Sequence, residues 1–129
     1  MQDEPKPAEI LAAVTAFLKD QVAPQTNGAL SFQARVAANA LSMMGRQLET
    51  ASAAEEKEKA RLEALLGRPG TLVELNGELA LRIAEGRVDL STPGLKDHLW
   101  RTTMAKLAVD QPTYAAYRAA LATPDIPRD

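Results

Sequence analysis

Apolar residues recur along most of the chain at the spacing of amphipathic helices. In the first such segment they lie three or four residues apart, which places them on one face of a helix. They are Ile10, Leu11, Val14, Phe17, Leu18 and Val22. Pro5 and Pro7 precede them, and proline fits a first helical turn because its missing N–H has no partner there. Pro24 predicts the end of this helix, since proline disrupts a helix interior.

The next segment, from about Leu30 to Glu49, is apolar on two faces. One face is formed by Leu30, Ala37, Leu41, Met44 and Leu48, and the other by Phe32, Val36, Ala40 and Met43. A helix that is apolar on two sides is usually buried on both. We therefore expect this helix to form the centre of a bundle.

Capping signals and glycines divide the remainder of the chain into shorter helices. Ser52-Ala53-Ala54-Glu55 has the form of a capping box and predicts a third helix that ends at Gly67. Thr71-Leu72-Val73-Glu74 predicts a fourth helix that runs to Gly86. A fifth is expected from about Leu95 to Val109, and a short sixth after Pro112.

The sequence thus predicts an all-α fold, a compact bundle of five to six helices with short connections. Runs of alanine, the best helix former, and an aromatic content of only 4% favour the same fold class. We expect one domain over residues 1–129, with the ends 1–6 and 123–129 frayed.

Charge and cysteine content narrow the functional classes. The chain has 15 basic and 17 acidic residues and no clustered basic block, which disfavours nucleic-acid binding. Cysteine is absent, so disulfides and thiolate chemistry are excluded. Because neither a signal peptide nor a membrane span is recognisable, we expect a soluble cytoplasmic protein without membrane association.

The sequence offers no recognisable catalytic centre. Its single histidine, His98, excludes histidine-rich metal sites, and no glycine-rich phosphate loop is present. Asp97 is adjacent to His98, but sequence neighbours do not face each other on a helix. We favour an ordinary surface or partly buried histidine over a general base, and expect neither a metal nor a cofactor.

Four polar residues form a ridge on the second predicted helix. Arg35, Asn39, Ser42 and Arg46 follow one another at helical spacing, between the two apolar faces. One interpretation is structural, a solvated stripe or a set of contacts to neighbouring helix ends. The other is recognition, because arginine binds carboxylate or phosphate with a planar fork and asparagine fixes orientation. The residues alone favour the structural interpretation.

Two further positions stand out on later helices. Lys106 lies in line with apolar residues, where a lysine usually keeps its stem buried and its ammonium in water. It is also a candidate contact for an anionic ligand or a partner. Gly77 is placed inside the fourth predicted helix, where glycine costs about 1 kcal/mol relative to alanine. A close helix contact would explain its presence.

Several segments resemble a family of small bacterial all-α domains of unknown function. They are Phe32 to Leu41 with its Ala34-Arg35-Val36-Ala37-Ala38-Asn39 motif, Leu62 to Gly67, and Ala105 to Pro112. Members of that family tend to be encoded beside aminoglycoside-phosphotransferase-like kinases and acyl-CoA dehydrogenases. The resemblance implies a companion of a kinase that acts on hydroxyacyl-CoA substrates, with Arg35, Asn39 and Lys106 among the typical residues.

The leading hypothesis is therefore a non-catalytic accessory protein that binds such a phosphotransferase-like kinase. Arg35, Asn39, Arg46 and Lys106 are the candidate partner- or ligand-binding residues. The alternatives are a stand-alone binder of an anionic small ligand such as acyl-CoA, and a helical homo-oligomer without a ligand. An autonomous enzyme fits least well, because paired catalytic acids and bases are hard to find here.

Overall fold

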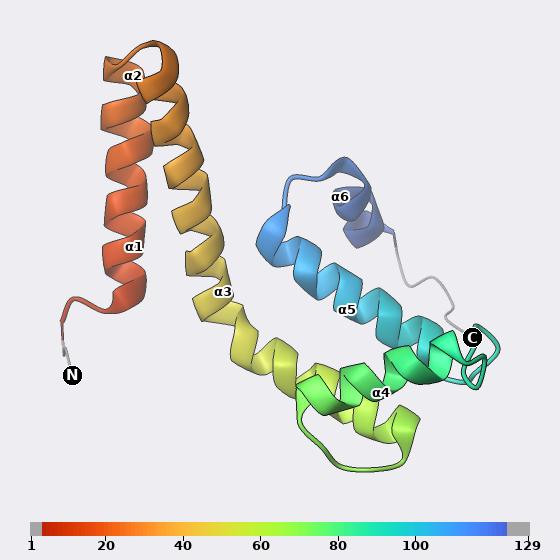
Figure 1. Ribbon diagram of the computed structural model, residues 1–129. Helices are drawn as coiled ribbons and strands as arrows, with labels where there is room; N and C mark the ends of the chain where they lie inside the picture. Colours follow the sequence, from red (N-terminus) through yellow and green to blue (C-terminus); the bar gives the residue numbers. More distant parts are fainter. Residues whose placement is uncertain (1–3, 124–129) are drawn as a thin grey trace. The chain divides into compact units, whose positions relative to one another are not determined.

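A computed structural model describes residues 4–123 of the chain (Figure 1). These residues form helices joined by turns and loops, without a strand, so the all-α prediction is confirmed. The elements are α1 (Pro7–Ala16), η1 (Phe17–Val22), α2 (Ala23–Gln25), α3 (Gly28–Leu66), α4 (Leu72–Ala84), α5 (Leu95–Asp110) and α6 (Ala115–Ala122). Of the ends predicted to fray, residues 1–3 and 124–129 lie outside the described part.

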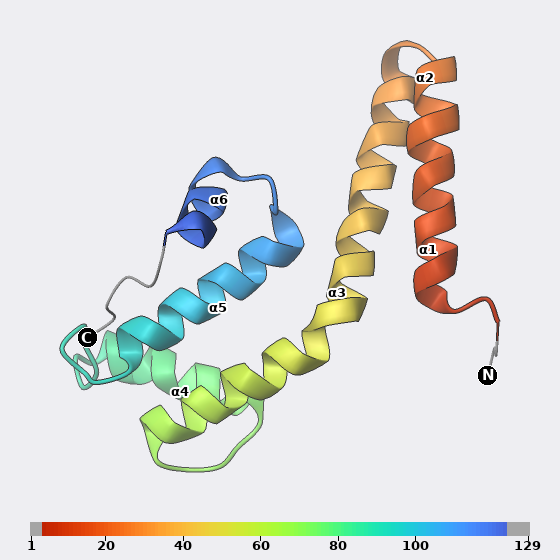
Figure 2. The same ribbon diagram turned by 180° about the vertical axis from the view of Figure 1, so that it is seen from behind.

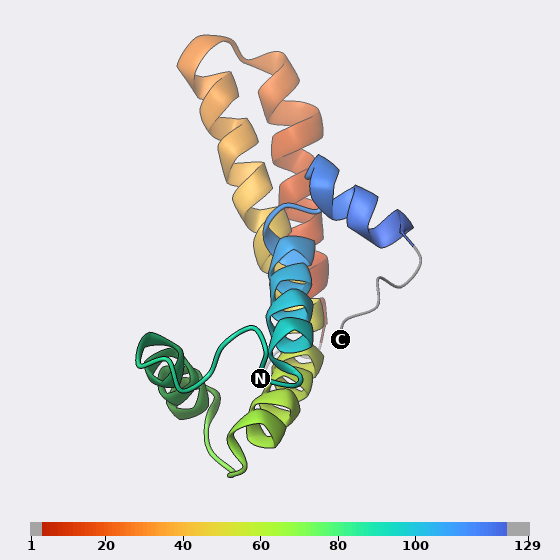
Figure 3. The same cartoon turned by 90° about the vertical axis from the view of Figure 1, so that its right-hand side faces the viewer.

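The chain divides into two compact units, Met1–Ala51 and Ser52–Asp129. The first is a helical hairpin in which α1, η1 and α2 run antiparallel to the first part of α3 (Figures 1 and 2). The second contains the end of α3 together with α4, α5 and α6 (Figure 3). A single domain over the whole chain stays a prediction.

The predicted break between the second and third helices is wrong. α3 is one helix of 39 residues that passes through the Ser52–Glu55 segment. A capping box begins a new helix, and it interrupts the preceding one only if its first residue leaves the helical conformation. Between Gly45 and Gly67 the chain has neither glycine nor proline, and alanine, glutamate and lysine favour continued helix. The capping sequence is therefore not used as a cap.

Helical structure ends at Gln25, one residue after Pro24 and so close to the predicted end, but its form changes before the proline. The turn before it, η1, is a π-helix in which the Ala23 N–H donates to the Leu18 carbonyl five residues earlier. Proline has no N–H, and its ring crowds the carbonyl four residues before it. The wider π-turn accommodates such a residue, and helical structure then continues to Gln25.

Small side chains form the contact between the two arms of the hairpin. Ala23, Ala34, Ala38 and Ser31 are each less than a tenth exposed. Large apolar residues on both faces of this part of α3 are exposed instead: Leu30, Phe32, Val36, Met43, Met44 and Leu48. The expectation that both apolar faces are buried is therefore wrong, because within the hairpin α3 packs against a single helical arm along its line of small residues.

Leucines from three helices form the core of the second unit. They are Leu62 and Leu66 of α3, Leu75 and Leu79 of α4, and Leu95 of α5. The predicted capping box begins α4: the Thr71 hydroxyl accepts from the Glu74 N–H at 3.3 Å, and the Glu74 carboxylate accepts from the Thr71 N–H at 2.9 Å. This cap fixes where α4 starts, and so places Leu75 in the core.

Gly77 makes no close helix contact. A Cβ atom built on Gly77 meets no atom within 4 Å outside its own helical neighbourhood. The close contact that the sequence suggested at this position is therefore absent from the described residues. The structure offers no physical reason for glycine here.

His98 is buried beside the leucine core, with 2% of its surface exposed. Its Nδ1 atom has no hydrogen-bond partner within the described chain. Burial lowers the pKa of His98, and the positive charge of Arg61 lowers the pKa further, against the opposing charges of Glu58 and Asp97. The folded state therefore favours the neutral imidazole. His98 is more deeply buried than the surface or partly buried histidine that the sequence suggested.

We predict that stability falls when the pH drops below about 6.5, the ordinary pKa of histidine. Because the folded-state pKa of His98 lies below that value, the unfolded chain takes up the proton first. The contribution is complete above that pH and is lost as the pH falls toward the folded-state pKa, by at most about 1.4 kcal/mol per pH unit for one proton. Urea unfolding of the wild type and of His98→Leu between pH 5 and 8 checks this prediction. An equal slope in both proteins would contradict it, since the chain has no other histidine.

Candidate functional site

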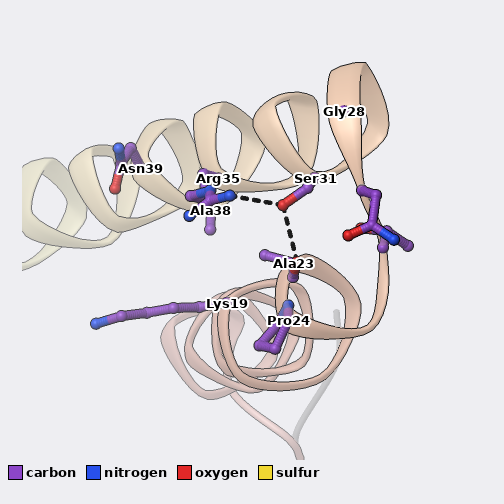
Figure 4. A pocket seen from close by; sticks show the side chains of 10 residues that line it. Lys19, Ala23, Pro24, Gly28, Ser31, Arg35, Ala38 and Asn39 are labelled. Atoms are coloured by element: carbon purple, nitrogen blue, oxygen red, sulfur yellow. Dashed lines mark hydrogen bonds between the residues drawn. The ribbon is translucent and has the colours of Figure 1, made fainter.

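A pocket lies between the two arms of the hairpin near the turn. It has a volume of about 660 Å³. Its lining residues are Lys19, Ala23, Pro24, Thr26, Asn27, Gly28, Ser31, Arg35, Ala38 and Asn39. The lining contains two cationic side chains and no carboxylate. The structure thus brings together the predicted residues Arg35 and Asn39, and adds Lys19 from the opposite arm (Figure 4).

A buried serine ties Arg35 to the turn. The Ser31 hydroxyl donates to the Ala23 carbonyl at 2.8 Å and accepts from Arg35 Nη2 at 2.6 Å (Figure 4). Ser31 is only 4% exposed, whereas Arg35 is exposed. Arg35 therefore contacts Ser31 of its own helix, one turn earlier, and Ser31 in turn contacts the end of the preceding arm. A guanidinium has five N–H donors, so this contact leaves donors for a ligand.

The charges of Lys19 and Arg35 are not neutralised by ion pairs within the described chain. The ion pairs found over residues 59–101, in the second unit, involve neither Lys19 nor Arg35. In Figure 4 the Lys19 side chain runs below Arg35 and Asn39, along the facing arm. The positive end of the α3 dipole is also at this pocket, since Gly28, the first residue of α3, lines it. The pocket therefore has a positive electrostatic character.

Arg46 belongs to the second pocket, which is farther from the turn and has a volume of about 390 Å³. Lys19, Asp20, Ser42 and Glu49 also line this pocket, so its charges are mixed. Arg46 is half-buried and makes other interactions of its own. The predicted ridge is thus shared between two neighbouring pockets, with Lys19 common to both.

Lys106 lies on α5 in the second unit, where it is exposed. It lines neither of the two hairpin pockets. Its role in binding stays a prediction.

The side of the hairpin opposite the larger pocket is apolar. On α3, Leu30, Met44 and Leu48 project within about 40° of one another, because an α-helix turns about 100° per residue. The buried residues Ala34 and Ala38 lie between this direction and that of the pocket residue Arg35.

The same reasoning holds for the other arm. Ile10, Val14 and Phe17 share one direction, and the half-buried Leu18 lies between this direction and that of the pocket residue Lys19. Since the arms are antiparallel, both apolar sets fall on one side of the hairpin. We call it the apolar face. Its residues are Ile10, Val14, Phe17, Leu30, Met44 and Leu48, each between 38% and 60% exposed.

Sequence reasoning missed Lys19 and Ser31. Ser31 immediately precedes an apolar residue in a helical pattern, and nothing in that pattern marks it as buried. Lys19 is an exposed lysine on the first predicted helix, and lysine is ordinarily a surface residue. Only the pairing of the two arms places Lys19 opposite Arg35, so no local signal identifies it.

No group of three or more His, Asp or Glu side chains in residues 4–123 is arranged to hold a metal ion. No helix within this range is both long enough and apolar enough to cross a membrane.

The structure defines an all-α protein with a two-sided helical hairpin: a cationic pocket on one side and an apolar face on the other. Residues 24–114 match the model of a family described as a domain of unknown function, DUF6285. The match covers more than half of the chain, which therefore belongs to this family. It includes Arg35, Asn39, Arg46 and Lys106, whereas α1 and Lys19 precede it. No curated protein matches the chain, and no solved structure matches it.

Proposed function

We propose that this chain is a cytoplasmic, non-catalytic accessory protein that binds another protein through the apolar face of its hairpin. The partner is an aminoglycoside-phosphotransferase-like kinase that acts on hydroxyacyl-CoA substrates. The class of partner follows from the family resemblance. The observation that supports a binding role is the apolar face itself.

Six large apolar side chains on one side of a hairpin are unusual for a surface that meets only water. Single exposed apolar residues are common, but a contiguous apolar patch marks an interaction site in most proteins. The face has contributions from both arms, and the spacing of Leu30, Met44 and Leu48 is that of a helix packed against another helix. A helical apolar surface on the partner would complete this packing.

Two carboxylates placed in the apolar face should abolish binding. In the variant Val14→Glu/Met44→Glu, association would bury two unpaired charges, which is strongly unfavourable. The variant should still fold, since Val14 is 43% and Met44 51% exposed. We expect affinity for a purified kinase of this class from the same organism to fall by at least about 100-fold, measured by interferometry. Circular dichroism of each variant verifies its fold.

The matched control is Ala13→Glu/Gln47→Glu, which adds the same charge to the same two helices. Both positions are exposed and project away from the helix contact, so binding should be nearly unchanged. A third variant, Arg35→Gln/Asn39→Ala, tests the pocket side. Loss of binding only in this variant would place the partner at the pocket and contradict the proposal. Self-association detected by light scattering, with no affinity for the kinase, would favour a homo-oligomer instead.

A further inference from the structure

We propose that the larger hairpin pocket binds a phosphate group carried by a small organic molecule. The site consists of Lys19 from η1 and of Arg35 and Asn39 from α3. It lies next to the turn between the two arms, which the hydrogen bond from Ser31 to Ala23 closes. This inference does not depend on the partner proposed above, because the pocket and the apolar face lie on opposite sides of the hairpin.

The positive charge of the pocket favours an anionic ligand. Two cations line it without a carboxylate, in a chain whose acidic residues outnumber its basic ones. A phosphate monoester carries between about −1.5 and −2 charges at neutral pH, which matches two cations better than a single carboxylate does. The first turn of α3 begins at the pocket residue Gly28 and adds the positive end of a helix dipole, where backbone N–H groups have no acceptor within the helix.

Part of the binding geometry is present before a ligand arrives. Arg35 is held by Ser31, and the Ser31 hydroxyl is in turn fixed on the Ala23 carbonyl. An arginine that is already oriented loses less conformational entropy on binding than a mobile one. Asn39 is one helical turn beyond Arg35, so its amide extends the donor surface along the same face.

The size of the pocket indicates that the phosphate is part of a larger molecule. A volume of about 660 Å³ exceeds what a phosphate ion needs and is within the range of small-molecule pockets. Ala23, Pro24 and Ala38 provide an apolar wall for the organic part. Arg35 can contact two phosphate oxygens through its fork, and Lys19 provides a point charge from the other arm.

Calorimetry on the full chain tests the proposal with inorganic phosphate, with glucose 6-phosphate against glucose, and with succinate as a carboxylate probe. We expect saturable binding of both phosphate probes, weak binding of succinate and none of glucose. Lys19→Gln should weaken phosphate binding by at least about tenfold, and Arg35→Gln by more, because arginine engages two oxygens. Lys57→Gln removes an exposed cation from the same helix as Arg35 and should have no effect.

Three results would overturn the proposal: no saturable binding of either phosphate probe up to about 10 mM, affinities unchanged in Lys19→Gln/Arg35→Gln, or succinate bound as tightly as phosphate. Arg35→Gln could lose stability because Ser31 loses its hydrogen bond from Arg35. Lys19→Gln then still tests phosphate binding without a change in stability, since the exposed Lys19 makes no ion pair in the described chain. Phosphate-induced shifts of the Gly28 amide and the Asn39 side-chain amide in NMR spectra should localise the site. Kinase binding is measured separately, so the failure of one proposal leaves the other intact.

Discussion

Leu75→Ala should lower the free energy of unfolding by about 2–5 kcal/mol, the range observed for a buried leucine that is truncated to alanine. Leu75 is 0% exposed and packs within the leucine core of the second unit. A Cβ atom built on Gly70 would lie 3.1 Å from its side chain, so the loop before α4 also closes over it. Because so many neighbours surround Leu75, truncation would leave a cavity that they fill only in part.

Val73→Ala is the matched control for this change. Val73 is two residues from Leu75 on the same helix but is 84% exposed. Substitution of a surface residue usually changes stability by no more than about 0.5 kcal/mol. Urea unfolding followed by circular dichroism measures both variants. A similar loss in the two proteins would show that α4 does not pack as described.

Ala53→Pro should cost about 3 kcal/mol, because proline inside a helix removes a backbone hydrogen bond and crowds the carbonyl four residues earlier. Position 53 is in the interior of the continuous helix α3. If the chain instead started a new helix at Ser52, position 53 would be the first residue of that helix, where proline is well tolerated. The variant therefore distinguishes one helix from two.

Ala115→Pro provides the comparison within the same chain. Ala115 is the exposed first residue of α6, and Tyr114 before it has φ −59° and ψ 126°, a conformation that proline accepts in its preceding residue. We expect almost no loss of stability in this variant. Denaturant unfolding of both proteins is the measurement, and equal stability of Ala53→Pro and the wild type would indicate a break in α3.

The candidate site was only partly predictable. The helical period alone aligns Arg35, Asn39 and Arg46, since it depends only on residue spacing. The period does not show which of these residues lies beside a second helical arm. In the folded hairpin, Arg35 and Asn39 line one pocket and Arg46 lines the neighbouring pocket. Lys19 joins them only through the antiparallel pairing of the two arms, a contact between residues that are distant in sequence.

The sequence by itself determined the fold class, the start of α4 at Thr71 and the approximate ends of α5. These features depend on local interactions: helix propensity, apolar spacing and a capping box in which two residues satisfy each other's backbone N–H groups. It could not decide whether the similar motif at Ser52 is used, because that depends on whether the flanking residues leave the helix.

Tertiary structure decided which apolar side of each helix is covered. In the first unit the small residues Ala34 and Ala38 face the other arm, while Leu30 and Met44 stay exposed. The hydrophobic pattern alone favours burial of the larger side chains, since burial free energy grows with apolar area. Helix packing depends also on shape, and small residues let two backbones approach closely. Because the two arms meet along these small residues, the apolar face stays exposed and the cations Lys19 and Arg35 line one pocket.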